Sequence, residues 1–276
     1  MPYAIRGDVH THTIYSRHAY STIQENVQAA AEAGLELLGS ADHFSAMLFP
    51  ATDPAQVIRD YQFFTNQGIW PREWHGVTLL RACEADILTL EGGLYGQDIP
   101  VPQNITGSPF MRERSLYERV TSGLDCVVAS VHDRRFAEGA SLAQTTAMYV
   151  GALEQDKVFI LGHTGRSGVP YDLDEVLTVA KEKHKLIEIN EHSFDGGMGS
   201  CEGRCREIAV RCAELGVGIA VDTDAHIAPL IGRTPRAQAM LEEVHFPEEL
   251  IVNRGREPFL RELAAAGVCD LTELLG

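Results

Sequence analysis

Several features that define common protein classes are missing from this chain. No uninterrupted apolar run approaches the roughly 18 residues that a membrane-spanning helix needs, so no membrane association is expected. None of the six cysteines forms a Cys-x-x-Cys pair, which argues against zinc-ribbon and thioredoxin-type sites. The loops Gly-x-x-x-x-Gly-Lys and Gly-x-Gly-x-x-Gly are also absent, which disfavours a nucleotide-binding doubly wound fold.

Positive charge is scarce as well. The chain has 23 Lys and Arg residues against 39 Asp and Glu residues, and its formal net charge at pH 7 is −16. Nucleic acid binding relies on cationic side chains that neutralise phosphates, so nucleic acid is not an expected partner. The first residues, 1–6, lack the apolar core of a signal peptide, and we expect a cytoplasmic protein.

What the sequence does contain is an alternation of apolar strand-like runs with amphipathic helical stretches. The predicted strands are 4–9, 35–40, 76–83, 125–131, 158–161, 186–189 and 217–221. The main predicted helices are about 23–33, 54–66, 141–154, 173–183 and 203–215, and further helical segments follow toward the C-terminus. This order favours right-handed βαβ units and a parallel sheet. We expect an α/β fold, a distorted (β/α)7 TIM-like barrel, in which residues 1–276 form one domain with an irregular Gly- and Pro-rich insertion at about 91–117.

Residue types that bind metals follow most of the predicted strands. His10 and His12 lie at the end of the first strand, where residues two apart point to the same side. In a barrel, the carboxyl ends of the strands meet at one rim, where active sites are built. The candidate ligands at these ends and in the loops beyond them are His10, His12, His18, His43, Glu84, His132, His163, Asp224 and His226. This set exceeds the four positions of a tetrahedral zinc, so two or three metals are implied, and paired metals commonly catalyse displacement at phosphorus.

The motifs that carry these residues resemble those of the PHP family, named for polymerase and histidinol phosphatase. Asp8-Val9-His10-Thr11-His12-Thr13 is similar to its first motif, and Ala41-Asp42-His43 to its second. His132, His163 and Asp224-Ala225-His226 fall where its later metal motifs belong.

Two further segments resemble the YcdX-type stand-alone bacterial phosphatases of this family. They are His18-Ala19-Tyr20-Ser21-Thr22 and Ile69-Trp70-Pro71-Arg72. The similarity spans nearly the whole chain except the insertion at about 91–117, which looks longer than in those relatives.

The resemblance implies a PHP fold with a trinuclear centre of divalent zinc, manganese or iron. The first metal would be held by His10, His12, Glu84 and Asp224. The second would be held by Glu84, His132 and His163, with Glu84 bridging. The third would be held by His18, His43 and His226.

The chemistry of such a centre predicts the roles of neighbouring residues. A hydroxide that bridges the first two metals would attack phosphorus, because the cations lower the pKa of bound water. Arginines a few residues from a ligand would neutralise phosphate charge; the candidates are Arg17, Arg134, Arg135 and Arg166. Metal-bound water, Asp224 or an uncoordinated histidine would protonate the leaving oxygen.

Other residues beside the ligands have less specific interpretations. Asp8 and Asp42 adjoin ligands and are candidates to accept hydrogen bonds from ligand N–H groups, with a turn or cap role as the alternative. Asp222 is predicted to form hydrogen bonds at a strand end. His192 has a structural or a substrate-facing interpretation.

The sequence therefore predicts a metal-dependent phosphoesterase that acts on a small phosphorylated molecule. One alternative is a phosphodiesterase or exonuclease-like PHP domain that acts on nucleotides or nucleic-acid ends. Another is a metal-binding regulatory module without turnover. Amide or ester hydrolysis is more remote, because no lysine stands at a strand end suited to a carbamylated bridge. Relatives of the YcdX type make a homotrimer conceivable.

Overall fold

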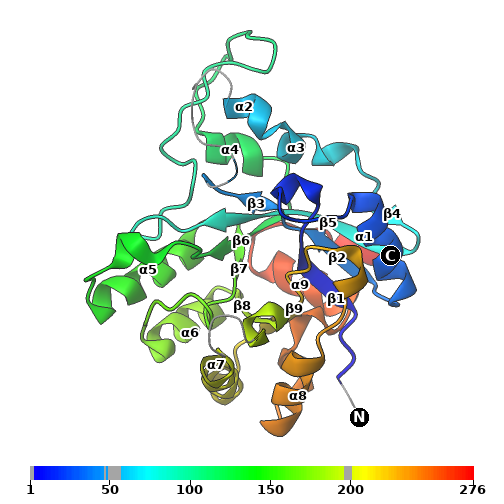
Figure 1. Cartoon of the computed structure of the whole chain (residues 1–276), viewed down its shortest axis with the longest axis vertical. Coiled ribbons are helices and arrows are strands. Elements are labelled where there is room, and N and C mark those ends of the chain that lie inside the picture. Colours follow the sequence, from blue (N-terminus) through cyan, green and yellow to red (C-terminus); the bar gives the residue numbers. More distant parts are fainter. Residues whose placement is uncertain (1–2, 47, 49–56, 196–200) are drawn as a thin grey trace.

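A computed structural model describes residues 3–46, 48, 57–195 and 201–276. Within these ranges, parallel strands form a nearly closed barrel ringed by helices (Figure 1). The barrel strands, in spatial order, are β1 (Gly7–Thr11), β2 (Leu37–Ser40), β5 (Val77–Asp86), β6 (Cys126–Ser130), β7 (Val158–Leu161), β8 (Leu186–Asn190) and β9 (Ile219–Asp222). The predicted distorted (β/α)7 barrel is confirmed.

Two short strands and several helices add to the seven barrel strands. β3 (His43–Phe44) pairs in parallel with β5, and β4 (Glu73–Trp74) pairs with it in antiparallel. The longer helices are α1 (Ile23–Glu32), α5 (Leu142–Glu154), α6 (Leu173–Glu182), α7 (Glu202–Leu215), α8 (Pro235–Glu243) and α9 (Arg256–Ala265). No helix in the described ranges is both long and apolar enough to cross a membrane.

Local sequence determines where several helices begin. Thr22 caps α1: its hydroxyl accepts from the Glu25 backbone N–H, and the Glu25 carboxylate accepts from the Thr22 backbone N–H. This reciprocal capping box is the one that the sequence predicts. Ser141 and Gln144 form the same arrangement at the start of α5.

The barrel closes between β9 and β1 through side chains along these strands and through backbone hydrogen bonds just beyond β9, where Thr11 bridges to Ala225. Asn253 Nδ2 donates to the carbonyl oxygens of Gly7 and Val221, both at 2.8 Å, and Asn253 Oδ1 accepts from Val221 N at 2.9 Å. Asp222 Oδ1 accepts from Val9 N at 2.7 Å, which confirms Asp222 as a hydrogen-bonding group at a strand end. The seam is therefore satisfied by two buried polar side chains instead of a full backbone ladder.

Apolar side chains fill the interior toward the amino ends of the strands. Their cluster combines residues of all seven barrel strands with α9, and includes Val9, Leu37, Leu80, Val128, Ile160, Leu186, Ala220, Phe259, Leu260 and Leu263. Helix α9 therefore packs against the barrel interior, and the buried polar side chains gather toward the carboxyl ends.

Several predicted boundaries are wrong. The first strand is Gly7–Thr11 instead of 4–9, because its parallel partner β2 first pairs with it at Gly7. Strand β5 continues to Asp86, so Glu84 lies inside a strand and not after it. The predicted helix 54–66 is divided into α2 (Val57–Asp60) and α3 (Gln62–Thr65), and its residues 54–56 lie outside the described ranges.

The predicted insertion at 91–117 is irregular for most of its length. Isolated antiparallel β-bridges connect parts of this segment, including Pro100 with Ser115 and Gln103 with Pro109. Its last two residues begin α4 (Leu116–Thr121), which the sequence reading missed. Residues 91–117 and helices α2 to α4 project together at the top of Figure 1.

Candidate metal centre

Strand β1 contains an irregularity that orients the first histidines. Between the last two of its three pairs with β2, β1 advances three residues while β2 advances two; these pairs are Asp8–Leu38 and Thr11–Ser40. This extra residue is a β-bulge, a feature often found beside active sites. The rings of His10 and His12 lie 5.2 Å apart between centroids, and both are fully buried.

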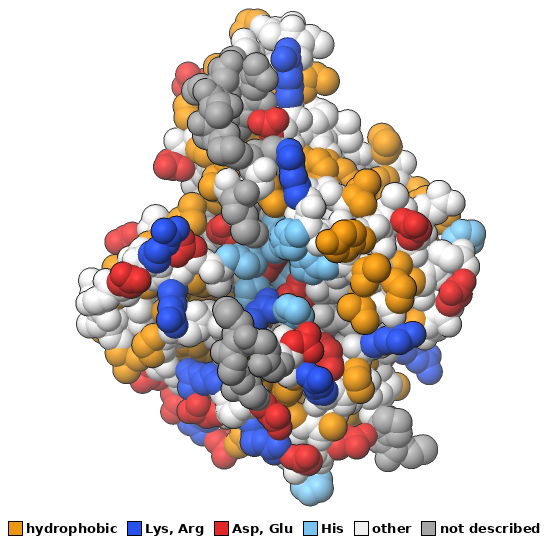
Figure 2. Space-filling view, viewed as in Figure 1, with side chains coloured by type: hydrophobic (Ala, Val, Ile, Leu, Met, Phe, Trp, Pro, Cys, Tyr) orange, Lys and Arg blue, Asp and Glu red, His pale blue; other side chains and the backbone are white. Residues whose placement is uncertain are grey.

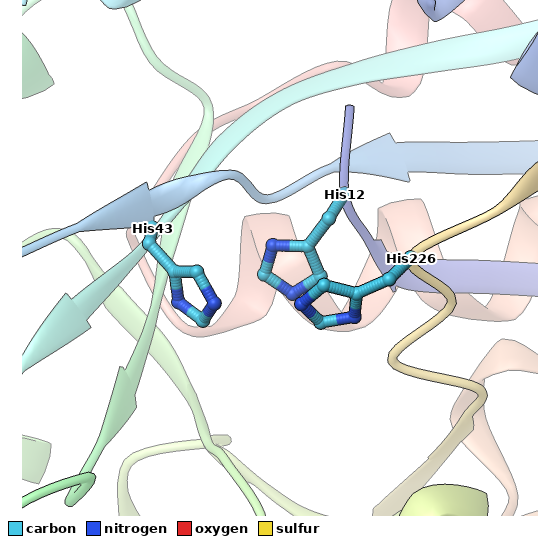
Figure 3. A group of neighbouring side chains, drawn as sticks. All are labelled: His12, His43 and His226. Carbon is cyan, nitrogen blue, oxygen red and sulfur yellow. The ribbon is translucent and has the colours of Figure 1, made fainter. Parts of the chain in front are cut away.

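The candidate ligands converge at the carboxyl rim of the barrel. Figure 2 shows histidine side chains gathered in a hollow on this face. In Figure 3, the rings of His12, His43 and His226 approach one another from three different segments. Three groups have ligand atoms within 4.8 Å of one another: His12 with His43 and His226; His10 with His12 and Asp224; and His43 with Glu84 and His132.

The two remaining candidates join the same cluster. His18 Nε2 lies 3.2 Å from His43 Nε2 and 3.0 Å from His226 Nε2. His163 Nε2 lies 2.7 Å from Glu84 Oε1. All nine candidates are therefore together. Their division among individual metals stays a prediction, since the geometry groups His12 as well as His18 with His43 and His226.

Glu84 occupies the centre of the cluster. Its Oε1 lies 2.7 Å from His163 Nε2, 3.3 Å from His132 Nε2 and 3.4 Å from His10 Nε2, and its Oε2 lies 2.7 Å from His43 Nδ1. Burial raises the pKa of this carboxyl group, but the surrounding histidines outweigh that effect and hold the pKa well below its usual value. A carboxylate with both oxygens among imidazoles is suited to bridge two cations.

The buried atoms that face the centre fit divalent metals. His10 Nε2, His12 Nε2 and Asp224 Oδ1 are buried and have no partner in hydrogen-bond geometry among the described residues. Leaving such atoms unpaired costs free energy, yet these three belong to one group whose atoms converge. Imidazole nitrogen and carboxylate oxygen are ligands for zinc and related metals, and such a cation would satisfy all three at once.

Backbone strain also marks two candidates. Asp224 has φ of 56° and His163 has φ of 28°, both in the region that favours glycine. The strained Asp224 backbone is held in place by its N–H, which donates to the His10 carbonyl at 3.0 Å. Strain of this kind persists at functional sites when the surrounding structure enforces it.

The sequence reading missed Glu188, which orients two of the histidines. Glu188 Oε1 lies 2.7 Å from His10 Nδ1, and Oε2 accepts from the His163 backbone N–H at 2.6 Å. With the proton of His10 on Nδ1, its Nε2 lone pair faces the centre. A single acidic residue within the apolar run Leu186-Ile187-Glu188-Ile189 was the available signal.

Two more polar residues contact the Nδ1 atoms of ligand histidines. Asp86 Oδ1 lies 2.7 Å from His132 Nδ1. Ser16 Oγ lies 3.0 Å from His12 Nδ1 and donates to Asp42 Oδ1 at 2.7 Å. Asp42 therefore contacts the His12 ring only through Ser16. The sequence had predicted a direct hydrogen bond from a ligand N–H group.

Asp8 and His192 lie apart from the ligands. Asp8 accepts from the backbone N–H groups of Thr223 and Gly232, so it supports the loop after β9 instead of a ligand ring. His192 is largely exposed and pairs with Asp195 at 2.9 Å. Neither contact orients a ligand.

The four candidate arginines occupy different environments. Arg166 Nη2 donates to Asp224 Oδ2 at 2.7 Å and is mostly buried. Arg134 is exposed, with Nη1 3.3 Å from the Gly168 carbonyl, and Arg135 pairs with Asp133. Arg17 is exposed next to His18. The structure thus brings Arg166 to the ligand cluster, and the catalytic roles of all four stay predictions.

The fold and this cluster define a class: an α/β barrel with a candidate metal-binding site at the carboxyl rim of its strands. The family model of the PHP domain matches residues 8–192 of this chain. A probable phosphatase of Clostridium acetobutylicum is 36% identical over 260 residues, covering 94% of this chain and 95% of the relative. One of Photobacterium profundum is 34% identical over 267 residues, covering 97% of each chain. The chain belongs to the PHP family, and it is an enzyme that hydrolyses phosphate esters.

Solved structures show the same fold. The histidinol phosphate phosphatase of Lactococcus lactis, solved with zinc, L-histidinol and phosphate, matches with a TM-score of 0.50 and 16% identity, covering 88% of this chain and 95% of that one. A structure described as a putative histidinol phosphatase of Listeria monocytogenes matches with a TM-score of 0.51 and 15% identity, covering 82% and 97%.

Proposed function

We propose that this protein is a phosphatase for small phosphorylated molecules and that its site holds three divalent metals, chosen among zinc, manganese and iron. The observation that carries the proposal is the convergence of nine imidazole and carboxylate ligands, with Glu84 at their centre. One tetrahedral metal needs four ligands, so nine ligands with a central bridging carboxylate support three.

The bound metals would supply a hydroxide nucleophile at neutral pH and would neutralise phosphate oxygens. The protein's own groups prepare the site for that chemistry. Glu188, Asp86 and Ser16 fix the rings of His10, His132 and His12 through their Nδ1 atoms. Because those rings are held before substrate arrives, little reorganisation is needed during the reaction.

Arg166 is the cation best placed to receive the phosphate group. Its Nη2 is held by Asp224 Oδ2, and the side chain is about one-fifth exposed, at 21%. An Arg that is fixed by one carboxylate and still reaches the mouth can offer its remaining N–H groups to phosphate oxygens. We assign Arg166 to binding the phosphate group of the substrate.

The charge of the chain favours a small substrate. A formal net charge of −16 repels a polyanion, whereas a small phosphate ester needs only a local cationic site. The L-histidinol and phosphate bound by the Lactococcus lactis relative belong to the same size class.

Substitution of central ligands tests the proposal. His10→Ala and Glu84→Ala should abolish hydrolysis of p-nitrophenyl phosphate by protein loaded with zinc or manganese. The matched control is His184→Asn, because His184 is exposed, pairs with Glu262 and contacts none of the nine ligands. Undiminished turnover in either ligand variant would sink the proposal. Metal binding by the wild type without turnover across a broad panel of phosphate esters would favour the regulatory-module alternative.

A further inference from the structure

Asn190, which the mechanism above does not use, is a buried amide without a partner. It is the last residue of β8 and is 1% exposed. Neither Nδ2 nor Oδ1 has a hydrogen-bond partner among the described residues. A buried amide that stays unpaired costs free energy, so a residue in this state needs a partner from outside the described residues, either water or a ligand that replaces it.

The strand geometry places this amide at the mouth of the barrel. Asn190 lies two residues after Glu188, so both side chains point to the same face of β8. That face is the interior, because the Glu188 carboxylate contacts His10 Nδ1. Asn190 also pairs with Asp222 of β9, whose carboxylate accepts from Val9 N inside the seam. The Asn190 amide therefore lies closer than Glu188 to the carboxyl end of β8, on the same side of the strand.

The two unpaired atoms restrict the chemistry of the missing partner. Nδ2 donates and Oδ1 accepts. A phosphate oxygen accepts only, so it would pair with Nδ2 and leave Oδ1 facing an anion. The phosphate group already has Arg166, which reaches the cluster from the loop after the neighbouring strand β7. A hydroxyl group donates and accepts, and so it, or two adjacent hydroxyls, would satisfy both atoms.

We infer that Asn190 is a specificity-determining residue that binds hydroxyl groups on the organic part of the substrate. The substrate class is then the phosphate monoesters of polyols and sugars. This inference rests on the proposed phosphatase function and adds the identity of the leaving group to it.

Matched substrate pairs test the inference. The metal-loaded wild type and Asn190→Leu are compared on glycerol 3-phosphate against propyl phosphate, and on glycerol 2-phosphate against isopropyl phosphate. The wild type should prefer the hydroxylated ester of at least one pair by about 10- to 100-fold in kcat/KM, as expected for one or two neutral hydrogen bonds. In Asn190→Leu this ratio should fall close to 1, with hydrolysis of the plain ester retained.

Two controls separate specificity from folding. Asn66→Leu, at the exposed end of α3, should keep the wild-type ratio. Leucine matches asparagine in shape and leaves no polar atom unpaired, so Asn190→Leu should unfold at the wild-type temperature or above it. If Asn190→Leu does not fold, Asn190→Ala replaces it in the same comparison.

The outcomes distinguish this inference from the function on which it rests. Equal ratios in wild type and variant, or no preference for the hydroxylated esters in the wild type, would overturn the role of Asn190 while p-nitrophenyl phosphate turnover leaves the phosphatase proposal standing. A fall in unfolding temperature with an unchanged ratio would show a structural role instead. Absence of hydrolysis of every ester by the metal-loaded wild type would overturn both.

Discussion

Replacing Glu188 with Gln should weaken metal binding without removing a ligand. The two carboxylate oxygens of Glu188 serve two different donors, His10 Nδ1 at 2.7 Å and His163 N at 2.6 Å. Glutamine has one oxygen and one NH2 group, so one of these donors would face another donor. The charge that favours a proton on His10 Nδ1 is also lost.

The size of the effect follows from these contacts. A hydrogen bond to a charged group is worth about 1.5–3 kcal/mol. Loss of a carboxylate that supports a metal-ligating histidine typically lowers metal affinity about 10- to 100-fold, which corresponds to about 1.4–2.8 kcal/mol. The two ranges agree, so we expect Glu188→Gln to lose about 10- to 100-fold in the affinity of the zinc that His10 binds.

Chelator competition measures that affinity directly, independent of catalysis. The matched control is Glu191→Gln. Glu191 also uses two oxygens for two backbone donors, Arg236 N at 3.1 Å and Ala237 N at 2.9 Å, but neither belongs to a ligand. Both variants should lose stability, and only Glu188→Gln should lose zinc affinity. Equal zinc affinity in Glu188→Gln and wild type would refute the reasoning.

Three further predictions concern stability. Asn253→Ala should destabilise the fold by about 3–5 kcal/mol in urea unfolding, because buried backbone groups of the barrel seam, including both polar groups of Val221, lose their partners; a change below about 1 kcal/mol would count against side-chain closure of the seam. Arg72→Met should cost about 3 kcal/mol, since the Asp125 carboxylate, which is 3% exposed, loses its cationic partner and keeps the Arg81 backbone N–H, while kcat per folded molecule stays unchanged; retained stability would contradict a stabilising role of this ion pair. Burial raises the pKa of Tyr171 to about 12, so its neutral form stabilises the fold fully below about pH 10 and that contribution is lost as pH rises toward 12. Wild type should therefore lose up to about 3 kcal/mol more stability than Tyr171→Phe over this range in alkaline urea titrations, and identical pH profiles would exclude this origin.

The candidate ligands could be proposed from sequence because imidazoles and carboxylates interrupt apolar strands near their ends. His132 and His163 each follow a short apolar run, and parallel strands bring such positions to one rim. The alternation of strands and helices was equally visible, which is why the barrel was predictable.

The features that could not be predicted from the sequence depend on strand register and strand length. The bulge in β1 appears only when its pairing with β2 is known. Asp86 lies on the same face as Glu84, but its role was hidden because the strand was expected to end at 83. That Glu188 and Asn190 face the interior becomes clear only when β8 is known to lie between β7 and β9. Periodicity shows that alternate residues share a face, without showing which face is inside.

Metal stoichiometry tests the central claim most directly. Protein stripped by a chelator and dialysed would be titrated with zinc or manganese, with bound metal measured by elemental analysis and hydrolysis of p-nitrophenyl phosphate followed in the same samples. The proposal predicts no hydrolysis without metal, recovery as metal is added and saturation at three metals per chain. Undiminished hydrolysis by the stripped protein, or full activity at a single bound metal, would contradict it.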